Sequence, residues 1–454
     1  MKKYALLAAM IFVSCKSAVE PDLRPSTNPA TPWTPPASLK QDTTIPPPPV
    51  VPQVPTGNVS LEQVLDVALQ NNPLTREAWL RARAAEAALG SERAAFLPEV
   101  DVLANAGRSK SPSGSAQTSA GASLALTYLL FDFGGREARV EQARQTLIAA
   151  GFLHNQVIQD VILRVEQAYY QYLDANALLE AQRATLEERR KSLDAAEARH
   201  RAGVATIADV LQARTAVSQA QLVYDTIEGN VRAIEGALAT AMGIPATTRF
   251  NVGVLPPEVP AEQVAEAVDV LIERAQRERP ELAAVRAEAE RAAARVREVR
   301  AAFLPSVTAS ASSGVSIATG GERTAPYSAI VGLRFPLFTG GRNTFDVREA
   351  ELQAELAREQ VRDFAQQVSL DVWTSYYALR TARQRLATSR DLLASAQQSA
   401  DVARARYREG LGTILDVLTA ESALENARAQ EVQARTDWFL ALAQLAHDTG
   451  RLNR

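Results

Sequence analysis

The sequence predicts a mainly α-helical chain that carries four membrane-spanning β-strands and consists of two copies of one module. Three observations lead to this fold class. Motifs of very different chemistry recur at a constant offset of 207 residues, which indicates an internal duplication. Each half contains two strand-like segments of membrane length and a proline-free helical stretch of 67 residues. The recurring motifs are Phe96-Leu97-Pro98 and Phe303-Leu304-Pro305, Tyr169-Tyr170 and Tyr376-Tyr377, Asp209-Val210-Leu211 and Asp416-Val417-Leu418, and Gly243 and Gly450.

The composition argues against a nucleic-acid partner, a metal centre and an enzyme. The 454 residues include 49 basic and 52 acidic side chains, so the chain offers no strong positive field for nucleic acid. The three histidines, His154, His200 and His447, and the single cysteine do not stand at metal-ligand spacing. The sequence has no glycine-rich phosphate loop, no nucleophile elbow and no motif that pairs catalytic carboxylates. We therefore predict no catalytic residue, no cofactor and no bound metal.

Residues 1–15 are predicted to be a signal peptide, and residues 16–58 an extended tether. Lys2 and Lys3 precede an apolar run that is too short to cross a bilayer, as in the signals of exported proteins. The run ends at Cys15, a candidate lipidation residue that resembles the cysteine of a lipoprotein signal; an ordinary signal with an incidental cysteine is the alternative. The tether contains 12 of the 23 prolines and no hydrophobic periodicity, so it cannot bury enough apolar surface to fold.

Each copy starts with a helical pattern and continues into two strands. In the first copy the helical pattern runs from Ser60 to about Ala95 and stops before Pro98, because proline disfavours helical geometry in the preceding residue. Alternation of apolar residues then predicts the strands. We expect strands at 100–107 and 122–130 around a loop at 108–121, and, in the second copy, a strand from 307, a loop at 316–327 and a strand at 329–337.

The length of these strands indicates a membrane. They are about 9–10 residues long, which is what a tilted strand needs to cross a bilayer. A soluble surface hairpin is the alternative, but a two-stranded hairpin alone is only marginally stable. Because lipid does not tolerate an open sheet edge, four such strands need partner chains to complete a closed wall. The sequence therefore predicts an obligate oligomer that contacts membrane lipid.

Two long helices follow the strand pairs. Arg136–Ala202 and Asn343–Glu409 are each 67 residues without proline, and each comes after a Gly-Gly pair that permits a sharp turn from strand to helix. They are rich in alanine and charged residues, so they carry a narrow apolar seam that suits coiled-coil pairing. Each is expected to turn at a glycine, Gly203 or Gly410, and to be followed by a shorter helix that returns.

Duplicated strand pairs flanked by long coiled-coil helices, after a signal and a proline-rich leader, resemble the TolC-type outer-membrane efflux protein family, in its lipoprotein branch. The resemblance covers about residues 59–450. It implies a homotrimer whose four strands per chain form a 12-stranded β-barrel, continued by a long α-helical barrel in the periplasm. The expected domains are a first repeat at 59–243, an equatorial linker at 244–262 and a second repeat at 263–454.

The resemblance also implies a function. It identifies the chain as the passive outer-membrane exit duct of a tripartite efflux system, driven by an inner-membrane transporter through a periplasmic adaptor protein. A duct for type I protein secretion is one alternative. A periplasmic coiled-coil lipoprotein scaffold without a pore is the other, but a scaffold does not need four strands of bilayer length.

Candidate functional residues lie where the long helices turn. The family closes its periplasmic end with acidic and tyrosine side chains, and the matching gate residues are Asp209, Tyr407 and Asp416; Gly412 and Thr419 stand where a well-known member has an arginine and a second acid. Six turn residues are predicted to dock the adaptor: Gly203, Val204, Thr206, Gly410, Leu411 and Thr413. The alternative is purely structural, since Thr-X-X-Asp is a helix-capping spacing and glycine suits any tight turn.

Overall fold

The computed structural model describes residues 58–256 and 267–452, except positions 111, 113, 115, 320 and 322. All of these residues belong to one unit, Pro52–Arg454. The signal 1–15 with Cys15, the tether 16–58 except its last residue, and residues 257–262 of the expected linker lie outside the described residues.

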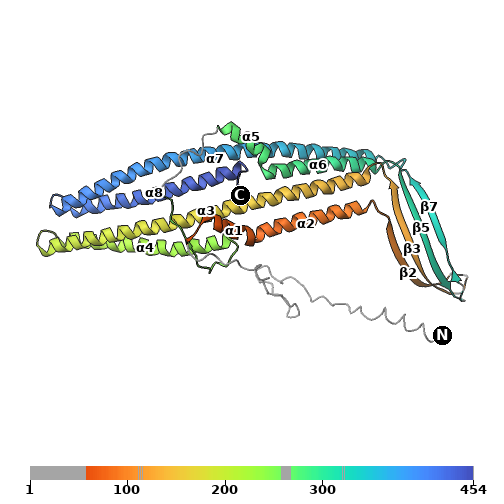
Figure 1. The fold of residues 1–454 in the computed structure, drawn as a ribbon, viewed down its shortest axis with the longest axis horizontal. Helices are drawn as coiled ribbons and strands as arrows, with labels where there is room; N and C mark the ends of the chain where they lie inside the picture. Colours follow the sequence, from red (N-terminus) through yellow and green to blue (C-terminus); the bar gives the residue numbers. More distant parts are fainter. Residues whose placement is uncertain are drawn as a thin grey trace, which may run out of the picture. The chain divides into compact units, whose positions relative to one another are not determined.

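Figure 1 shows how the helices and strands follow one another in this unit. The helices are α1 (Leu61–Asn71), α2 (Pro73–Ala94), α3 (Gly135–Arg201), α4 (Ile207–Ala241), α5 (Val268–Glu278), α6 (Pro280–Ala301), α7 (Arg342–Arg408) and α8 (Ile414–Asp448). The strands are β1 (Asn58–Val59), β2 (Glu99–Ser109), β3 (Gln117–Phe131), β4 (Asn251–Val252), β5 (Ser306–Ala318), β6 (Arg323–Thr324) and β7 (Tyr327–Arg334).

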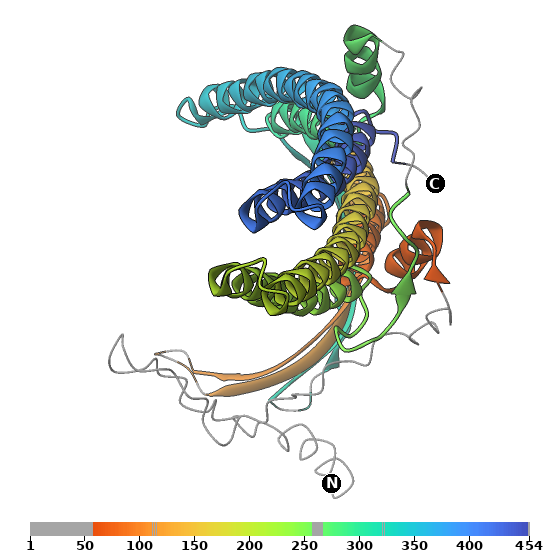
Figure 2. The ribbon, with the colours of Figure 1, turned by 90° about the vertical axis from the view of Figure 1, so that its left-hand side faces the viewer.

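The long helices confirm the prediction from the proline-free stretches. α3 and α7 each contain 67 residues, and each begins directly after a glycine with positive φ, Gly134 at 88° and Gly341 at 84°. α4 packs along α3, and α8 packs along α7, so each half ends in an antiparallel helical hairpin. Figure 2 shows the two hairpins from their turns as separate pairs. No described helix has a segment long and apolar enough to cross a membrane.

The expected single helix from Ser60 to Ala95 is wrong, because the chain breaks between α1 and α2. Asn72 is extended, with φ −65° and ψ 125°, since the residue before a proline avoids helical geometry. Pro73 then occupies the first turn of α2, where its missing N–H costs nothing. The same break separates α5 from α6, at Arg279 and Pro280.

The sheet has the strand order β2-β3-β5-β7, with short β6 also paired to β5. β3 and β5 contain 15 and 13 residues and are longer than expected. The loop predicted at 108–121 is too long, because Arg108 pairs with Thr118 and Ser109 with Gln117. The small polar residues at these strand ends do not alternate with apolar residues, so the sequence pattern did not predict a strand there. Their backbone groups nevertheless pair and lengthen both strands. By contrast, β7 is shorter than expected: it ends at Arg334 and not at residue 337, since Pro336 has no N–H to donate.

The register of the sheet separates a mainly apolar face from a mainly polar face. Directly paired residues in an antiparallel sheet point to the same side. One row across the four strands is Val100, Leu126, Ala311 and Ala329, and the next row, on the opposite side, is Asp101, Ala125, Ser312 and Ser328. The hydroxyl groups of Ser312 and Ser328 lie 2.9 Å apart, which places both on this second face.

The main apolar core lies around the middle of the long helices, away from the sheet and the helix turns. It includes Val165 of α3, Val372 of α7 and Trp438 of α8, all buried. β1 pairs in parallel with β4, through Asn58 with Asn251 and Val59 with Val252, so the start of the first repeat is joined to the described part of the expected linker. This core therefore joins the helices of the first hairpin, α3 and α4, to those of the second, α7 and α8.

Candidate functional site

Both helix turns are capped as the threonine–aspartate spacing predicts. Thr206 precedes α4 and Thr413 precedes α8, and each forms a complete capping box with the aspartate three residues later, Asp209 or Asp416. In the second turn, the Thr413 N–H donates to Asp416 Oδ2 at 2.9 Å. This hydrogen bond lowers the pKa of the exposed Asp416 carboxyl, which therefore stays ionised. The caps fix where both carboxylates lie: in the first turn of each returning helix.

The turns themselves need glycine. Gly203 and Gly410 have φ of 74° and 78°, a left-handed conformation that other residues rarely adopt. The next residue closes each turn, as Val204 N–H donates to Arg199 O and Leu411 N–H donates to Arg406 O. The side chains of Val204 and Leu411 then face solvent, with 63% and 71% of their surface exposed. The six predicted docking residues are thus brought together at the ends of the two hairpins.

The third predicted gate residue, Tyr407, is buried. It packs with Ala196, Val210 and Val417 in a small apolar cluster that joins α3, α4, α7 and α8. The Arg199 guanidinium lies 4.8 Å from the ring centroid, and its Nη1 donates to the Tyr407 carbonyl at 2.8 Å. Burial raises the pKa of Tyr407. The contact connects the turn of the first hairpin to the end of α7 in the second.

A cluster of buried and partly buried ion pairs, which the sequence did not reveal, lies further from the turns. Glu421 of α8 is 2% exposed. Its Oε2 accepts from Arg189 Nη1 of α3 at 3.0 Å, and its Oε1 accepts from Arg404 Nε of α7 at 3.0 Å and from Ser192 Oγ at 2.8 Å. One carboxylate therefore joins three helices.

A second carboxylate extends the connection. Glu188 of α3 pairs with Arg404 Nη2 at 3.0 Å and receives two hydrogen bonds from Arg428 of α8, at 2.9 and 3.1 Å. We call Glu188, Arg189, Arg404, Glu421 and Arg428 the tip ion-pair cluster. Its members look like ordinary exposed charges in the sequence, because Glu188 and Arg189 belong to a run of five charged residues. Only the packing of α3 against α8 shows that the cluster is shared between the hairpins.

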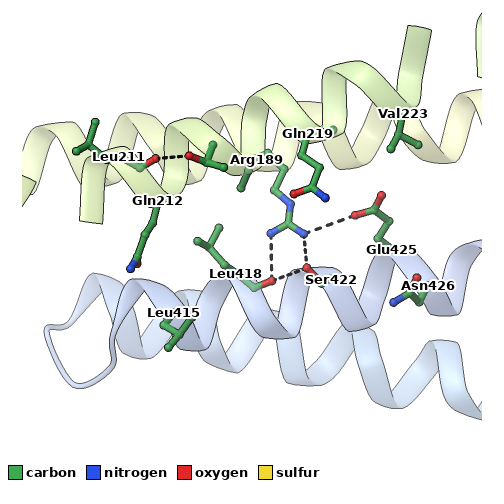
Figure 3. A pocket seen from close by; sticks show the side chains of 13 residues that line it. Arg189, Leu211, Gln212, Gln219, Val223, Leu415, Leu418, Ser422, Glu425 and Asn426 are labelled. Carbon is green, nitrogen blue, oxygen red and sulfur yellow. Dashed lines mark hydrogen bonds and ion pairs between the residues drawn. The ribbon is translucent and has the colours of Figure 1, made fainter. Parts of the chain in front are cut away.

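An open groove of about 670 Å³ lies between the two hairpins beside this cluster. Figure 3 shows Arg189 reaching across it from α3 toward Ser422 and Glu425 of α8. Apolar and amide side chains from both hairpins line the rest, among them Leu211, Gln212, Gln219, Leu415, Leu418 and Asn426. The tip region thus combines a capped acidic rim, exposed apolar turn residues, a groove and buried ion pairs that bridge the hairpins.

Solved structures of outer-membrane channels superimpose on this arrangement of long paired helices and a sheet. The structure of the outer membrane protein VceC from Vibrio cholerae superimposes with a TM-score of 0.75 at 24% identity, over 86% of this chain and 96% of that one. The family model for outer membrane efflux proteins matches the chain over residues 64–244 and again over 271–451. The chain belongs to the outer membrane efflux protein family.

Curated relatives agree with this assignment. Protein CyaE of Bordetella pertussis is 29% identical over 410 residues, which is 87% of this chain and 85% of the relative. Outer membrane efflux protein BepC of Brucella suis is 28% identical over 415 residues and covers 87% of each chain. The resemblance inferred from the sequence motifs is therefore confirmed at the level of the family.

Proposed function

We propose that this chain is the outer-membrane exit duct of a tripartite efflux system, through which small molecules pass passively. Its partners in this proposal are two sister chains, a periplasmic adaptor protein, an inner-membrane transporter and outer-membrane lipid. The observation that carries the proposal is the sheet, which has one apolar face, one polar face and two open edges. A wall between lipid and a water-filled passage needs one apolar and one polar face, and its edges must be closed by further strands.

The edges of the sheet argue for closure by sister chains. β2 and β7 each pair on one side only among the described residues, and all their residues are exposed. Unpaired strand edges and exposed apolar side chains such as Val102, Val331 and Leu333 are costly unless they are covered. In the proposed homotrimer, β7 of one chain pairs with β2 of the next, which gives a 12-stranded barrel that α3 and α7 continue into the periplasm.

The remaining assignments follow from this arrangement. The two matches to the family model support an internal duplication into repeats 59–243 and 263–454, joined by the linker 244–262. In the proposal the signal 1–15 directs export, Cys15 carries a lipid anchor, and residues 16–58 connect it to the channel. The apolar row that includes Leu126 faces lipid, and the row that includes Ser312 faces the passage.

The proposed gate is the ring of helix tips, where Asp209 and Asp416 limit the passage and the buried Tyr407 holds the two hairpins together behind them. If the Asp416 carboxylates of three chains stand about 8 Å apart, each pair repels by about 2 kcal/mol at an effective dielectric of about 20. Within each chain, the tip ion-pair cluster and the Arg199–Tyr407 contact hold the second hairpin, which carries Asp416, to the first and so limit its outward movement. The gate would then be a balance between repulsion at the rim and ion pairs behind it.

Single-channel recording in planar bilayers tests both the pore and its acidic rim. We expect the wild-type protein to form a cation-preferring pore, and Asp416→Asn and Asp416→Ala to lose much of that preference. The asparagine variant is the control for helix capping, because its amide oxygen still accepts the Thr413 N–H while the charge is gone. A wild-type protein that forms no pore contradicts the proposed function, and unchanged selectivity in both variants contradicts the acidic gate alone.

The exposed turn residues make a prediction about the adaptor. Replacing Leu411 with glutamate should abolish capture of the adaptor, because a charge at an exposed apolar turn disrupts a hydrophobic contact between helical tips. The assembly of the protein itself should not change. Leu392→Glu, at a residue that is also exposed on α7 but lies away from the turn, is the matched control. Pull-down of a periplasmic adaptor protein that the wild type captures measures the effect, and equal capture by Leu411→Glu and wild type would refute docking at this turn.

A further inference from the structure

Three potential metal ligands from distant parts of the chain meet near the end of α8. They are Asp160 in α3, Glu281 in the first turn of α6 and His447 in the last turn of α8. One ligand atom from each lies within 4.8 Å of the other two. His447 Nε2 is 2.9 Å from Asp160 Oδ1, and its Nδ1 is 3.2 Å from Asp448 Oδ1.

The Glu281 side chain is a second, independent observation at this place. It is 7% exposed, and its Oε2 is buried without a hydrogen-bond partner. The nearest cationic atom, Arg279 Nε, is 3.4 Å away, and the same guanidinium donates to Asp371 Oδ2 at 2.8 Å. Arg279 is thus shared between Glu281 and Asp371, and a buried carboxylate oxygen without a hydrogen-bond donor is costly, so a further cation beside Glu281 would be favourable.

We propose that Asp160, Glu281 and His447 bind a divalent transition-metal ion of the Zn²⁺ type. One imidazole nitrogen and two carboxylate oxygens are a donor set that suits Zn²⁺, whereas Mg²⁺ and Ca²⁺ prefer oxygen ligands only. Ligand atoms of a tetrahedral zinc site lie about 3.3 Å apart, so small side-chain rotations from the present positions are sufficient.

The surroundings of His447 match those of a metal-bound histidine. Such a histidine usually donates its second ring N–H to a carboxylate, and Asp448 stands at Nδ1. The Asp160 side chain is 40% exposed, which leaves an opening for the ion and for water as a fourth ligand. A bound ion would take the place of the direct contact between His447 Nε2 and Asp160 Oδ1.

The other copy of the module does not have these ligands. The residues 207 positions away from Glu281, His447 and Asp160 are Leu74, Thr240 and Gln367, none of which is a carboxylate or an imidazole. The fold does not require the three ligand types at these places, because the first half forms the same elements without them. A bound ion would fasten α6 and α8 of the second half to α3 of the first.

Isothermal titration calorimetry of the detergent-solubilised full-length protein, untagged and treated with EDTA, tests the site. We expect one Zn²⁺ per chain, no comparable Mg²⁺ binding, and affinity at least tenfold lower in Glu281→Gln, Asp160→Asn and His447→Gln. His154→Gln, at a partly exposed histidine of α3, is the matched control and should bind as the wild type does.

Thermal unfolding with and without Zn²⁺ distinguishes loss of the metal site from misfolding of a variant. Zn²⁺ should raise the thermal midpoint of the wild type and of His154→Gln, but not that of Glu281→Gln, which keeps the shape of the side chain. Absence of Zn²⁺ binding to the wild type overturns the proposal, as does equal binding by folded Glu281→Gln and Asp160→Asn. Neither result would affect the proposed channel, because pore formation is measured separately.

Discussion

Replacing Leu126 with lysine is expected to prevent assembly of the folded protein in the outer membrane. Leu126 lies on β3 in the middle of the sheet, paired with Val100 on one side and Ala311 on the other. On the apolar face its side chain would meet hydrocarbon, where a lysine costs about 2–4 kcal/mol per chain near the bilayer centre. Every chain of the oligomer carries the substitution, so the cost is repeated. Membrane fractionation and resistance of the oligomer to SDS measure the outcome.

The neighbouring residue supplies the control. Ala125 occupies the same strand and the same depth but points to the polar face, in the row of Asp101 and Ser312. Ala125→Lys should therefore assemble normally, since a lysine there would face water. If both variants assemble equally well, or if Ala125→Lys is the more damaging, the assignment of the two faces is wrong.

Replacing Glu421 with alanine should both weaken the fold at the helix tips and raise the resting conductance of the pore. The change leaves Arg189 without its nearest carboxylate and removes one partner of Arg404. Removing one partner of a buried ion pair typically costs about 3–5 kcal/mol. Because Glu421 joins α8 to both α3 and α7, its loss also frees the second hairpin to move from the first. Chemical denaturation and single-channel recording measure the two effects.

A nearby glutamate on the same helix is the matched control. Glu425 lies 3.6 Å from Arg189, but its side chain is 28% exposed, so Glu425→Ala should have a much smaller effect. The double variant Arg189→Ala/Glu421→Ala should lose less than the sum of the two single variants, because the two residues act on each other. Wild-type conductance and stability in Glu421→Ala would contradict the role of the cluster.

Features determined by local backbone chemistry could be predicted from the sequence. The capping boxes at Thr206 and Thr413 and the left-handed turns at Gly203 and Gly410 depend on residues within one helical turn. The lengths of α3 and α7 followed from the absence of proline. The break at Pro73 could also have been predicted, because proline restricts the residue before it whether or not the helical pattern continues.

Features that depend on packing between distant segments could not be predicted. Glu421 and Arg189 are 232 residues apart, and nothing in either local sequence separates them from exposed charges. Tyr407 was expected at the tip, but its burial depends on Val210 and Val417, which come from other helices. The group of Asp160, Glu281 and His447 has no motif spacing, since each ligand lies on a different helix.

Disulfide trapping between the two edges of the sheet tests the central claim most directly. Val102 on β2 is replaced by cysteine, in combination with a cysteine at each apolar-face position of β7 in turn: Tyr327, Ala329, Val331 and Leu333. Within one chain, β3 and β5 separate the two edges by about 14 Å, too far for a disulfide. We predict that at least one pair gives a covalent ladder that ends at three chains. A protein in a native membrane that stays monomeric with every pair would contradict closure of the sheet by sister chains.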